Sequence, residues 1–183
     1  MVKSNSMKKY LYVATLSVLA ACHNQPGNNN VVVVEETKEN KREIPEFNGT
    51  IDSVSLKNLM VNYFTIKNAL IDGNAEAASK TGLVAFEQMP KGEDNVLNDI
   101  SKHLKLIGQS KELAQQRTYF YPLSELVYAV SSKQKPDTAT LFKQYCPMAF
   151  DDTGAWWISD EREVVNPYFG EEMLNCGMVQ EEY

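Results

Sequence analysis

Four consecutive segments between Ser55 and Val130 repeat apolar side chains at steps of three and four residues, and this repeat constrains the fold more than any other feature. Such steps place side chains on one face of an α-helix. The first segment stops at Asp72 and Gly73, a pair that favours the end of a helix. Its apolar face consists of Leu56, Leu59, Met60, Tyr63 and Leu70.

Residues that start and end helices divide the following region into further segments. Asn74 is expected to cap a second helix that runs to Met89, before a proline. Asp94 or Asn95 is expected to open a third helix that ends before Gly108. The apolar face of this third helix consists of Leu97, Ile100, Leu104 and Ile107.

A heptad pattern predicts a fourth helix, which Pro122 is expected to kink or interrupt because proline lacks the N–H that a helix interior uses. Four amphipathic helices with short connections must bury their apolar faces against one another. They therefore favour an up-and-down four-helix bundle. The heptad face of the fourth helix is formed by Leu113, Gln116, Phe120, Leu123, Val127 and Val130.

The helical repeat is lost after Pro136. Leu141–Cys146 and Ala155–Ser159 are short segments rich in aromatic and β-branched residues, and the turn-forming cluster Asp151–Gly154 separates them. This pattern predicts a small C-terminal β-hairpin packed on the bundle. The expected fold class is therefore α+β, mostly α.

The composition fits one folded domain. Hydrophobic residues make up 43% and charged residues 23% of the 183 residues, as in ordinary globular proteins. The net charge is -6 and no cluster of Lys or Arg is present, which argues against nucleic-acid binding. We expect a single globular domain over residues 51–183, with helices in 53–134 and the hairpin in 139–183.

The N-terminal residues have the pattern of a bacterial export signal. Basic residues precede the apolar run Leu11–Ala21, which falls short of the roughly 20 residues that span a bilayer as a helix. Leu19–Cys22 resembles the lipobox of bacterial lipoproteins. This resemblance implies cleavage before Cys22 and diacylation of its thiol, so residues 1–21 are expected to be a signal peptide.

Residues 22–50 have no apolar repeat and are expected to be a flexible tether, although Val31–Val34 also suit a strand. Several acyl chains anchor a protein almost permanently, at about 0.8 kcal/mol per buried CH2. His23–Pro26 contains no acidic residue, which by resemblance to sorting rules implies the outer membrane, facing the periplasm. The inner membrane and the cell surface stay open as alternatives, and so does a start at Met1 or at Met7.

Two Cys-x-Met pairs in the last third of the chain are the main candidates for chemistry. In an extended backbone, residues two apart point to the same side, so each pair would present a thiolate and a thioether together. Soft sulfur ligands select Cu(I), and Ag(I) behaves likewise. The candidate ligands are Cys146, Met148, Cys176, Met178 and the nearby Met173, with Trp156 or Trp157 as a cap through its ring face.

The alternative for Cys146 and Cys176 is a disulfide. Exported compartments are oxidising, and acylation of Cys22 leaves these two as the remaining thiols. Closing a loop of about 30 residues would stabilise the fold by roughly 3.5 kcal/mol. The chain would then be a structural or partner-docking module of the cell envelope.

Enzymatic chemistry is not expected, because histidine is scarce. His23 lies in the tether, and His103 lies beside the apolar face of the third helix, so a Cys-His or Ser-His-Asp arrangement would depend on His103. A partly buried helix residue is the simpler interpretation of His103, and an additional metal ligand is the other one.

Four motifs near the C-terminus carry a resemblance to a known family: Tyr145–Met148, Gly154–Trp157, Asn166–Gly170 and Met173–Gly177. Together with the helical stretch Gln116–Ser124, they resemble the family catalogued as domain of unknown function 3347. The resemblance extends over about Ser53 to Val179.

Members of this family are common in Bacteroidota. They include exported lipoproteins and domains fused to proteins that resemble periplasmic adaptor subunits of copper and silver efflux pumps. The resemblance implies a periplasmic lipoprotein that binds or relays a soft heavy-metal ion in connection with metal efflux or tolerance. Copper is the first candidate for this ion. It also implies an efflux-pump adaptor or another envelope protein as a partner.

Overall fold

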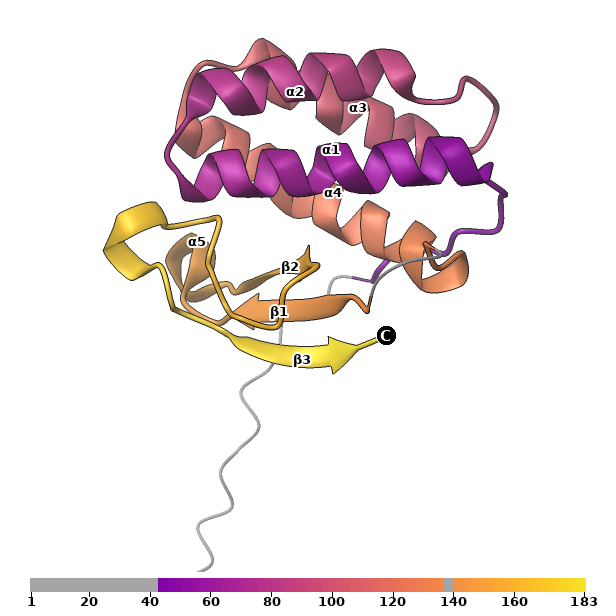
Figure 1. Cartoon of the computed structure of the whole chain (residues 1–183). Coiled ribbons are helices and arrows are strands. Elements are labelled where there is room, and N and C mark those ends of the chain that lie inside the picture. Colours follow the sequence, from indigo (N-terminus) through magenta and orange to yellow (C-terminus); the bar gives the residue numbers. More distant parts are fainter. Residues whose placement is uncertain (1–42, 137–139) are drawn as a thin grey trace, which may run out of the picture. The chain divides into compact units, whose positions relative to one another are not determined.

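The computed structural model describes residues 43–136 and 140–183. In these residues the chain forms four long α-helices and a small antiparallel sheet, which lies below the helices in Figure 1. This is the predicted α+β fold, mostly α. The elements are α1 (Ser53–Ile71), α2 (Ala75–Gln88), α3 (Asn95–Gln109), α4 (Leu113–Lys133), β1 (Phe142–Cys146), α5 (Ala149–Asp152), β2 (Ala155–Ser159), the 3-10 turn η1 (Gly170–Met173) and β3 (Met178–Glu182).

Three of the long helices begin at a capping side chain. Asn74 caps α2 as predicted, and Asp94 rather than Asn95 caps α3. Helix α1 starts at Ser53, where the predicted helical region 53–134 begins, and Asp52 provides its cap. A cap of this kind contributes about 1 kcal/mol. The bonds run from Val54 N and Ser55 N to Asp52 Oδ1 (both 3.0 Å), from Ala77 N to Asn74 Oδ1 (2.9 Å) and from Leu97 N to Asp94 Oδ1 (2.9 Å).

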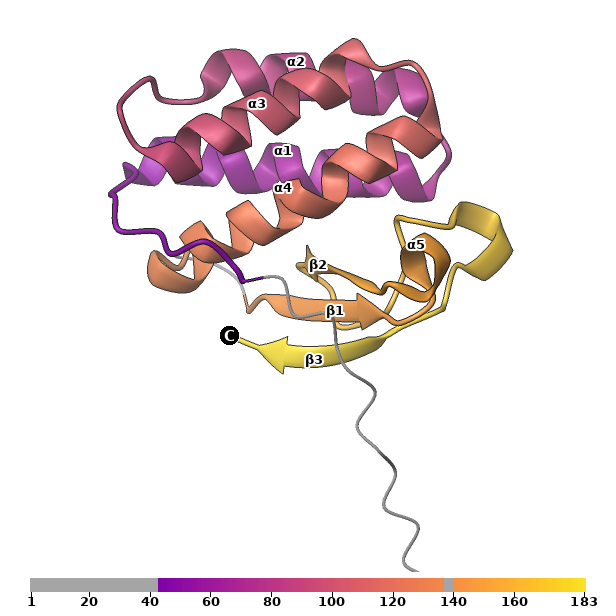
Figure 2. The same cartoon turned by 180° about the vertical axis from the view of Figure 1, so that it is seen from behind.

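The four helices follow one another up and down, as Figures 1 and 2 show. Gly108 lies inside α3, so the predicted end of this helix before Gly108 is wrong. The glycine has another role, because α2 and α3 approach closely there. A methyl group on Gly82 would lie 2.8 Å from the backbone nitrogen of Gly108. Ser79 Oγ donates to the carbonyl of Gly108 at 2.6 Å, which holds the two helices at this distance.

Helix α4 continues through Pro122, so the predicted interruption does not occur. A proline in a helix interior costs about 3 kcal/mol. Burial outweighs this cost, since the predicted heptad face is buried on both sides of the proline. Its residues Gln116, Phe120, Leu123, Val127 and Val130 are each 0% exposed.

The predicted hairpin is present as β1 and β2, which pair antiparallel from Phe142↔Ser159 to Cys146↔Ala155. The chain also adds a strand that the sequence did not predict. β3 pairs antiparallel with the other side of β1, which gives the order β2-β1-β3. Its residues MVQEE show no clear alternation, and four of the five are exposed.

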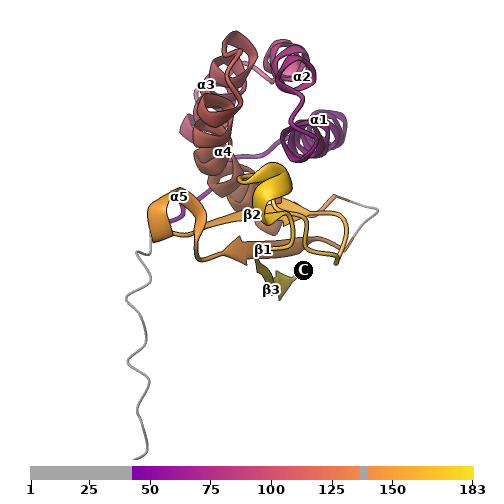
Figure 3. The same ribbon diagram turned by 90° about the vertical axis from the view of Figure 1, so that its left-hand side faces the viewer.

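A buried network of hydroxyl groups attaches the sheet to the bundle. Figure 3 shows the sheet beneath α1 and α4. The hydroxyl of Tyr63 in α1 lies 2.7 Å from Ser124 Oγ in α4, and it accepts a hydrogen bond from Ile158 N in β2 at 3.0 Å. Ser124 Oγ donates to the carbonyl of Phe120 at 3.0 Å. One side chain thus joins two helices and a strand.

The first described residues pack against the domain. Phe47 is 2% exposed and belongs to the core, although it falls in the predicted tether 22–50. Gln134 at the end of α4 holds the segment just before α1 in place. Its side-chain amide accepts a hydrogen bond from the N–H of Ile51 and donates one to the carbonyl of Ile51. Residues 1–42, with the predicted signal peptide and Cys22, lie outside the described part. No helix in the described part is long and apolar enough to cross a membrane.

Candidate functional site: the thiol pair and the aromatic groove

Cys146 and Cys176 meet at one end of the sheet. Cys146 is the last residue of β1 and is 0% exposed, while Cys176 follows η1 and is half-buried. Both are free thiols, and their side chains are hydrogen-bonded to each other. The fold therefore brings together the two cysteines that the sequence singles out.

Asn166 holds the segment that carries Cys176. Its side-chain N–H donates to the carbonyl of Cys176 at 2.8 Å, and its Oδ1 accepts from Tyr168 N at 2.8 Å. Its backbone N–H donates to the carbonyl of Leu174 at 2.7 Å. Because Asn166 is fully buried, these bonds fix the approach of Cys176 to β1. The motif Asn166–Gly170 thus has a structural role next to the thiols.

Gly177 permits the close approach of this segment to the sheet. Its φ is 148°, and a methyl group there would lie 2.9 Å from the carbonyl oxygen of Tyr145. The same methyl group would lie 3.0 Å from Val164 and 3.1 Å from Trp157. A side chain at this position would therefore push Cys176 away from Cys146.

The surroundings of Cys146 favour its protonated form. Burial raises the pKa of the Cys146 thiol to about 11, and the hydrogen bond that Cys146 shares with Cys176 adds to this rise because it favours the protonated form of Cys146. The backbone N–H groups of Met148 and Ala149 act in the opposite direction, because they bond to the sulfur and favour the thiolate. The thiol is consequently neutral at physiological pH, but donors that would stabilise a bound thiolate are in place.

The methionines that the sequence pairs with the thiols lie at or near the surface, and Met148 lacks the assumed extended backbone. Met148 lies in a turn after β1 with φ -87° and ψ -7°, so the extended backbone that the prediction assumed is absent at this residue. Cys146 is buried whereas Met148 is 47% exposed. Met178 is 55% exposed at the start of β3, and Met173 is half-buried in η1. Of the predicted sulfur ligands, the structure brings the two thiols into contact, and the methionine ligands stay a prediction.

The two tryptophans lie on opposite faces of β2. Trp157 is 0% exposed and packs edge-on against Tyr168, with ring centroids 5.8 Å apart. Trp156 is 9% exposed, and Lys143 Nζ lies 4.6 Å from the centroid of its ring. The ammonium group of Lys143 thus makes a cation–π contact with the ring face of Trp156. Trp157 is the tryptophan on the thiol side, beside Gly177.

His103 remains within the helical bundle. Its helix α3 packs on α2 and α4. Burial lowers the pKa of His103, and Lys102 lowers it further. No group of three or more His, Cys, Asp or Glu residues in the described part could hold a metal ion. His103 is thus half-buried in α3, and its alternative role as an additional metal ligand stays a prediction.

Comparison with models of known protein families gives a match for part of the chain. Residues 59–139 match the family model described as protein of unknown function (DUF3347). The predicted resemblance to this family is thereby confirmed for these residues. No curated protein and no solved structure matches the chain.

The DUF3347 match falls on the helical part of the fold, from α1 to the residues after α4. The motifs around Cys146 and Cys176, on which the sequence resemblance was based, follow the matched residues. The thiol pair thus lies outside the matched residues, in the C-terminal part of the chain that packs on the helices.

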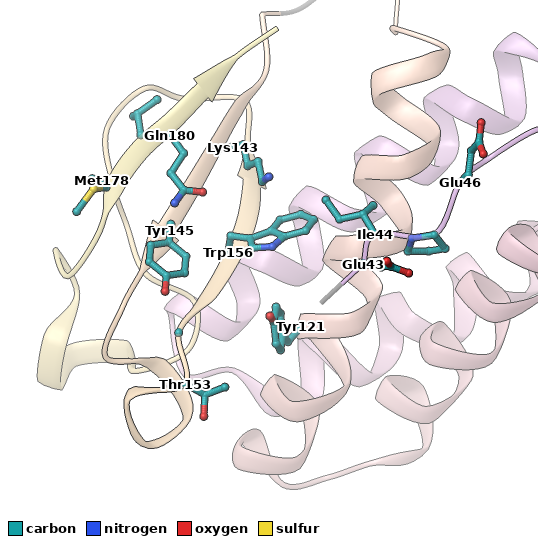
Figure 4. A pocket seen from close by; sticks show the side chains of 13 residues that line it. Glu43, Ile44, Glu46, Tyr121, Lys143, Tyr145, Thr153, Trp156, Met178 and Gln180 are labelled. Carbon is teal, nitrogen blue, oxygen red and sulfur yellow. The ribbon is translucent and has the colours of Figure 1, made fainter. Parts of the chain in front are cut away.

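A groove lies on the other face of the sheet, and no sequence motif predicted it. Its volume is about 1240 Å³, and Figure 4 shows how its walls come from the segment before α1, from α4 and from all three strands. Because these parts are distant in sequence, no local pattern could reveal the groove. The lining residues are Glu43, Ile44, Pro45, Glu46, Tyr121, Lys143, Tyr145, Thr153, Gly154, Trp156, Met178, Val179 and Gln180.

A left-handed turn directly precedes the lining residues Thr153 and Gly154. Phe150, Asp151 and Asp152 all have positive φ, a conformation that costs non-glycine residues about 1 kcal/mol or more each. Aromatic packing holds the turn in place. The Phe150 ring stacks on Tyr121 with centroids 5.6 Å apart and lies 5.2 Å from Tyr168.

Proposed function

We propose that the chain is a non-enzymatic, exported lipoprotein, anchored through Cys22, that binds one soft monovalent metal ion between Cys146 and Cys176. Cu(I) is the first candidate and Ag(I) the second, in connection with metal efflux or tolerance. The observation that carries the proposal is the contact between the two thiols, which are 30 residues apart in the chain.

The chemistry of a two-thiol site supports a monovalent soft ion. A structural zinc site needs four nitrogen or sulfur ligands, and the described residues provide no group of three candidates. Cu(I) and Ag(I) accept two thiolates in a nearly linear arrangement, and soft sulfur ligands select such ions. The half-buried Cys176 offers an entry route from solvent to the buried Cys146.

A competition titration with a Cu(I) chelator tests this proposal on the full chain carrying Cys22→Ser, which removes the thiol of the anchor. The double variant Cys146→Ser, Cys176→Ser is expected to bind Cu(I) at least about a hundredfold more weakly, because ligand bonds supply most of the binding energy of such sites. Equal affinities of the variant and the parent would overturn the metal site.

The matched control for this titration replaces two exposed methionines. Met148→Leu, Met178→Leu keeps the volume and hydrophobicity of both side chains while it removes both thioethers. Since these side chains are 47% and 55% exposed, the Cu(I) affinity is expected to stay within about threefold of the parent value. A large loss in this variant instead would restore the Cys-x-Met site that the sequence suggested.

The Cu(I) affinity should also rise with pH. Cys146 must lose its proton to bind the ion, and its pKa is raised to about 11. Between pH 6 and pH 8 the affinity is therefore expected to increase by about tenfold per pH unit from this thiol alone. Titrations at several pH values against a pH-corrected chelator measure the slope, and a pH-independent affinity would contradict the use of Cys146.

The alternative function is a disulfide-stabilised docking module of the cell envelope. The same thiol contact supports it, because buried neighbouring thiols in an oxidising compartment form a disulfide readily. A thiol count on the denatured Cys22→Ser chain, isolated from the envelope under acid quenching, distinguishes the two. Two reactive thiols agree with the metal site, and none agrees with the disulfide.

A further inference from the structure

Charge is distributed unevenly over the fold. Residues 43–136 contain eleven acidic and ten basic residues, and their charges nearly balance. Residues 140–183 contain nine acidic residues, all exposed, and two basic residues. The part of the chain that forms the sheet is therefore strongly acidic, although the helices that support it are nearly neutral. The acidic residues are Asp151, Asp152, Asp160, Glu161, Glu163, Glu171, Glu172, Glu181 and Glu182.

Several carboxylates border the groove on the sheet. Glu43 and Glu46 line it on the side of the first described residues. On the opposite side, Asp152 directly precedes the lining residue Thr153, and Glu181 directly follows the lining residue Gln180. Among the described residues that line the groove, Lys143 is the one base. The border of the groove therefore attracts positive charge.

The interior of the groove already holds a cation against aromatic rings. Lys143 Nζ lies 4.6 Å from the ring centroid of Tyr128 and 4.6 Å from that of Trp156. Such contacts attract a cation to the negative face of the ring. Tyr121 and Tyr145 line the same groove and provide further rings of the same kind. Its walls thus suit the alkyl stems and charged heads of Lys and Arg side chains.

We propose that this groove is the docking site for an extended, Lys- or Arg-rich segment of a partner protein. The cationic side chains of the partner would lie near Glu43, Glu46 and Glu181, and its apolar atoms would cover the exposed Met178. Successive residues of β1 alternate between the faces of the sheet, so Tyr145 faces the groove and Cys146 faces away. Docking is therefore independent of what the thiols bind.

Nuclear magnetic resonance titration of the full Cys22→Ser chain tests this inference. The probe is a short synthetic peptide of alternating lysine and valine, and the control peptide alternates glutamate and valine. The lysine peptide is expected to shift the amide resonances of Tyr145, Trp156 and Gln180. Its affinity should fall when salt is raised from about 0.05 M to 0.5 M, since exposed charges are screened.

Two charge-matched triple variants locate the site. Glu43→Gln, Glu46→Gln, Glu181→Gln is expected to weaken binding of the lysine peptide by about tenfold, because each exposed ion pair contributes about a factor of two. Glu76→Gln, Glu87→Gln, Glu93→Gln removes three exposed carboxylates from α2 and the loop that follows it, and should change the affinity less than twofold.

Three results would overturn the docking site. They are equal losses in the two triple variants, shifts confined to residues outside the groove, and equal or stronger binding of the glutamate peptide. Equal losses would mean that the peptide senses the overall negative charge of the chain, and stronger binding of the glutamate peptide would assign the groove to an acidic partner. Thermal unfolding of both variants confirms that they fold, since all six substitutions are at the surface.

Discussion

Gly177→Ala is expected to destabilise the fold by about 3 kcal/mol and to separate the two thiols. The added methyl group would lie 2.9 Å from the carbonyl oxygen of Tyr145, which is backbone and cannot rotate away. The φ of 148° is also one that side-chain-bearing residues rarely adopt. Relief of both strains requires the start of β3 to move from β1, and Cys176 moves with it.

Chemical denaturation of the reduced Cys22→Ser chain measures this loss of stability, and Cu(I) titration measures its effect on the site. Gly92→Ala is the matched control, because no atom lies within 4 Å of a methyl group there and its φ is not in the left-handed range. This control should change the free energy of unfolding by less than about 0.5 kcal/mol. Equal stabilities of the two alanine variants would show that the segment does not pack as described.

Tyr63→Phe is expected to cost about 2 kcal/mol, although it removes a single oxygen atom. The ring of Tyr63 stacks on Phe120 with centroids 5.0 Å apart, and phenylalanine preserves this contact. The hydroxyl, however, accepts from Ile158 N and contacts Ser124, and all three groups are buried. Its loss leaves the buried N–H of Ile158 without this acceptor, which is the main source of the cost.

The measurement for Tyr63→Phe is again the free energy of unfolding, combined with amide hydrogen exchange at Ile158. Exchange at this amide should become faster, because the sheet is held to the bundle through it. Tyr119→Phe removes a hydroxyl from a half-buried tyrosine of α4 that is not part of this network, and it serves as the control. If the two variants lose the same stability, the network does not attach the sheet.

The helical bundle could be predicted from sequence because its determinants are local. The caps at Asn74 and Asp94 and the spacing of apolar residues concern neighbours within a few turns. Even the buried Gln116 was assigned to the correct face. Its amide satisfies the carbonyls of Ala75 and Ser110, which are partners that no periodicity specifies.

The helix end predicted before Gly108 and the interruption predicted as one outcome at Pro122 are both wrong, and they have one physical cause. Both residues are local breakers of helices, and both are tolerated because tertiary packing outweighs their propensity. Gly108 lets α2 and α3 touch, and Pro122 lies between buried turns of α4. The sequence predicts an end before Gly108 and a kink or interruption at Pro122, because the packing partners are not neighbours in sequence.

The site was predicted in part. Cys146 and Cys176 were singled out by their number and by export chemistry, and the structure places them in contact. The inclusion of Met148 assumed an extended backbone, which the turn after β1 does not adopt. The groove gave no local signal, since its aromatic and acidic walls come from segments that only the assembled sheet brings together.

Sequence by itself determined the helices, their order, the hairpin and the identity of the two thiols, because these depend on spacing and composition within short segments. Tertiary structure decided which atoms meet. It placed β3 beside β1, left Met148 and Met178 about half exposed and put Lys143 on Trp156. These contacts join residues separated by long stretches of chain, and their energies depend on the packing of the whole domain.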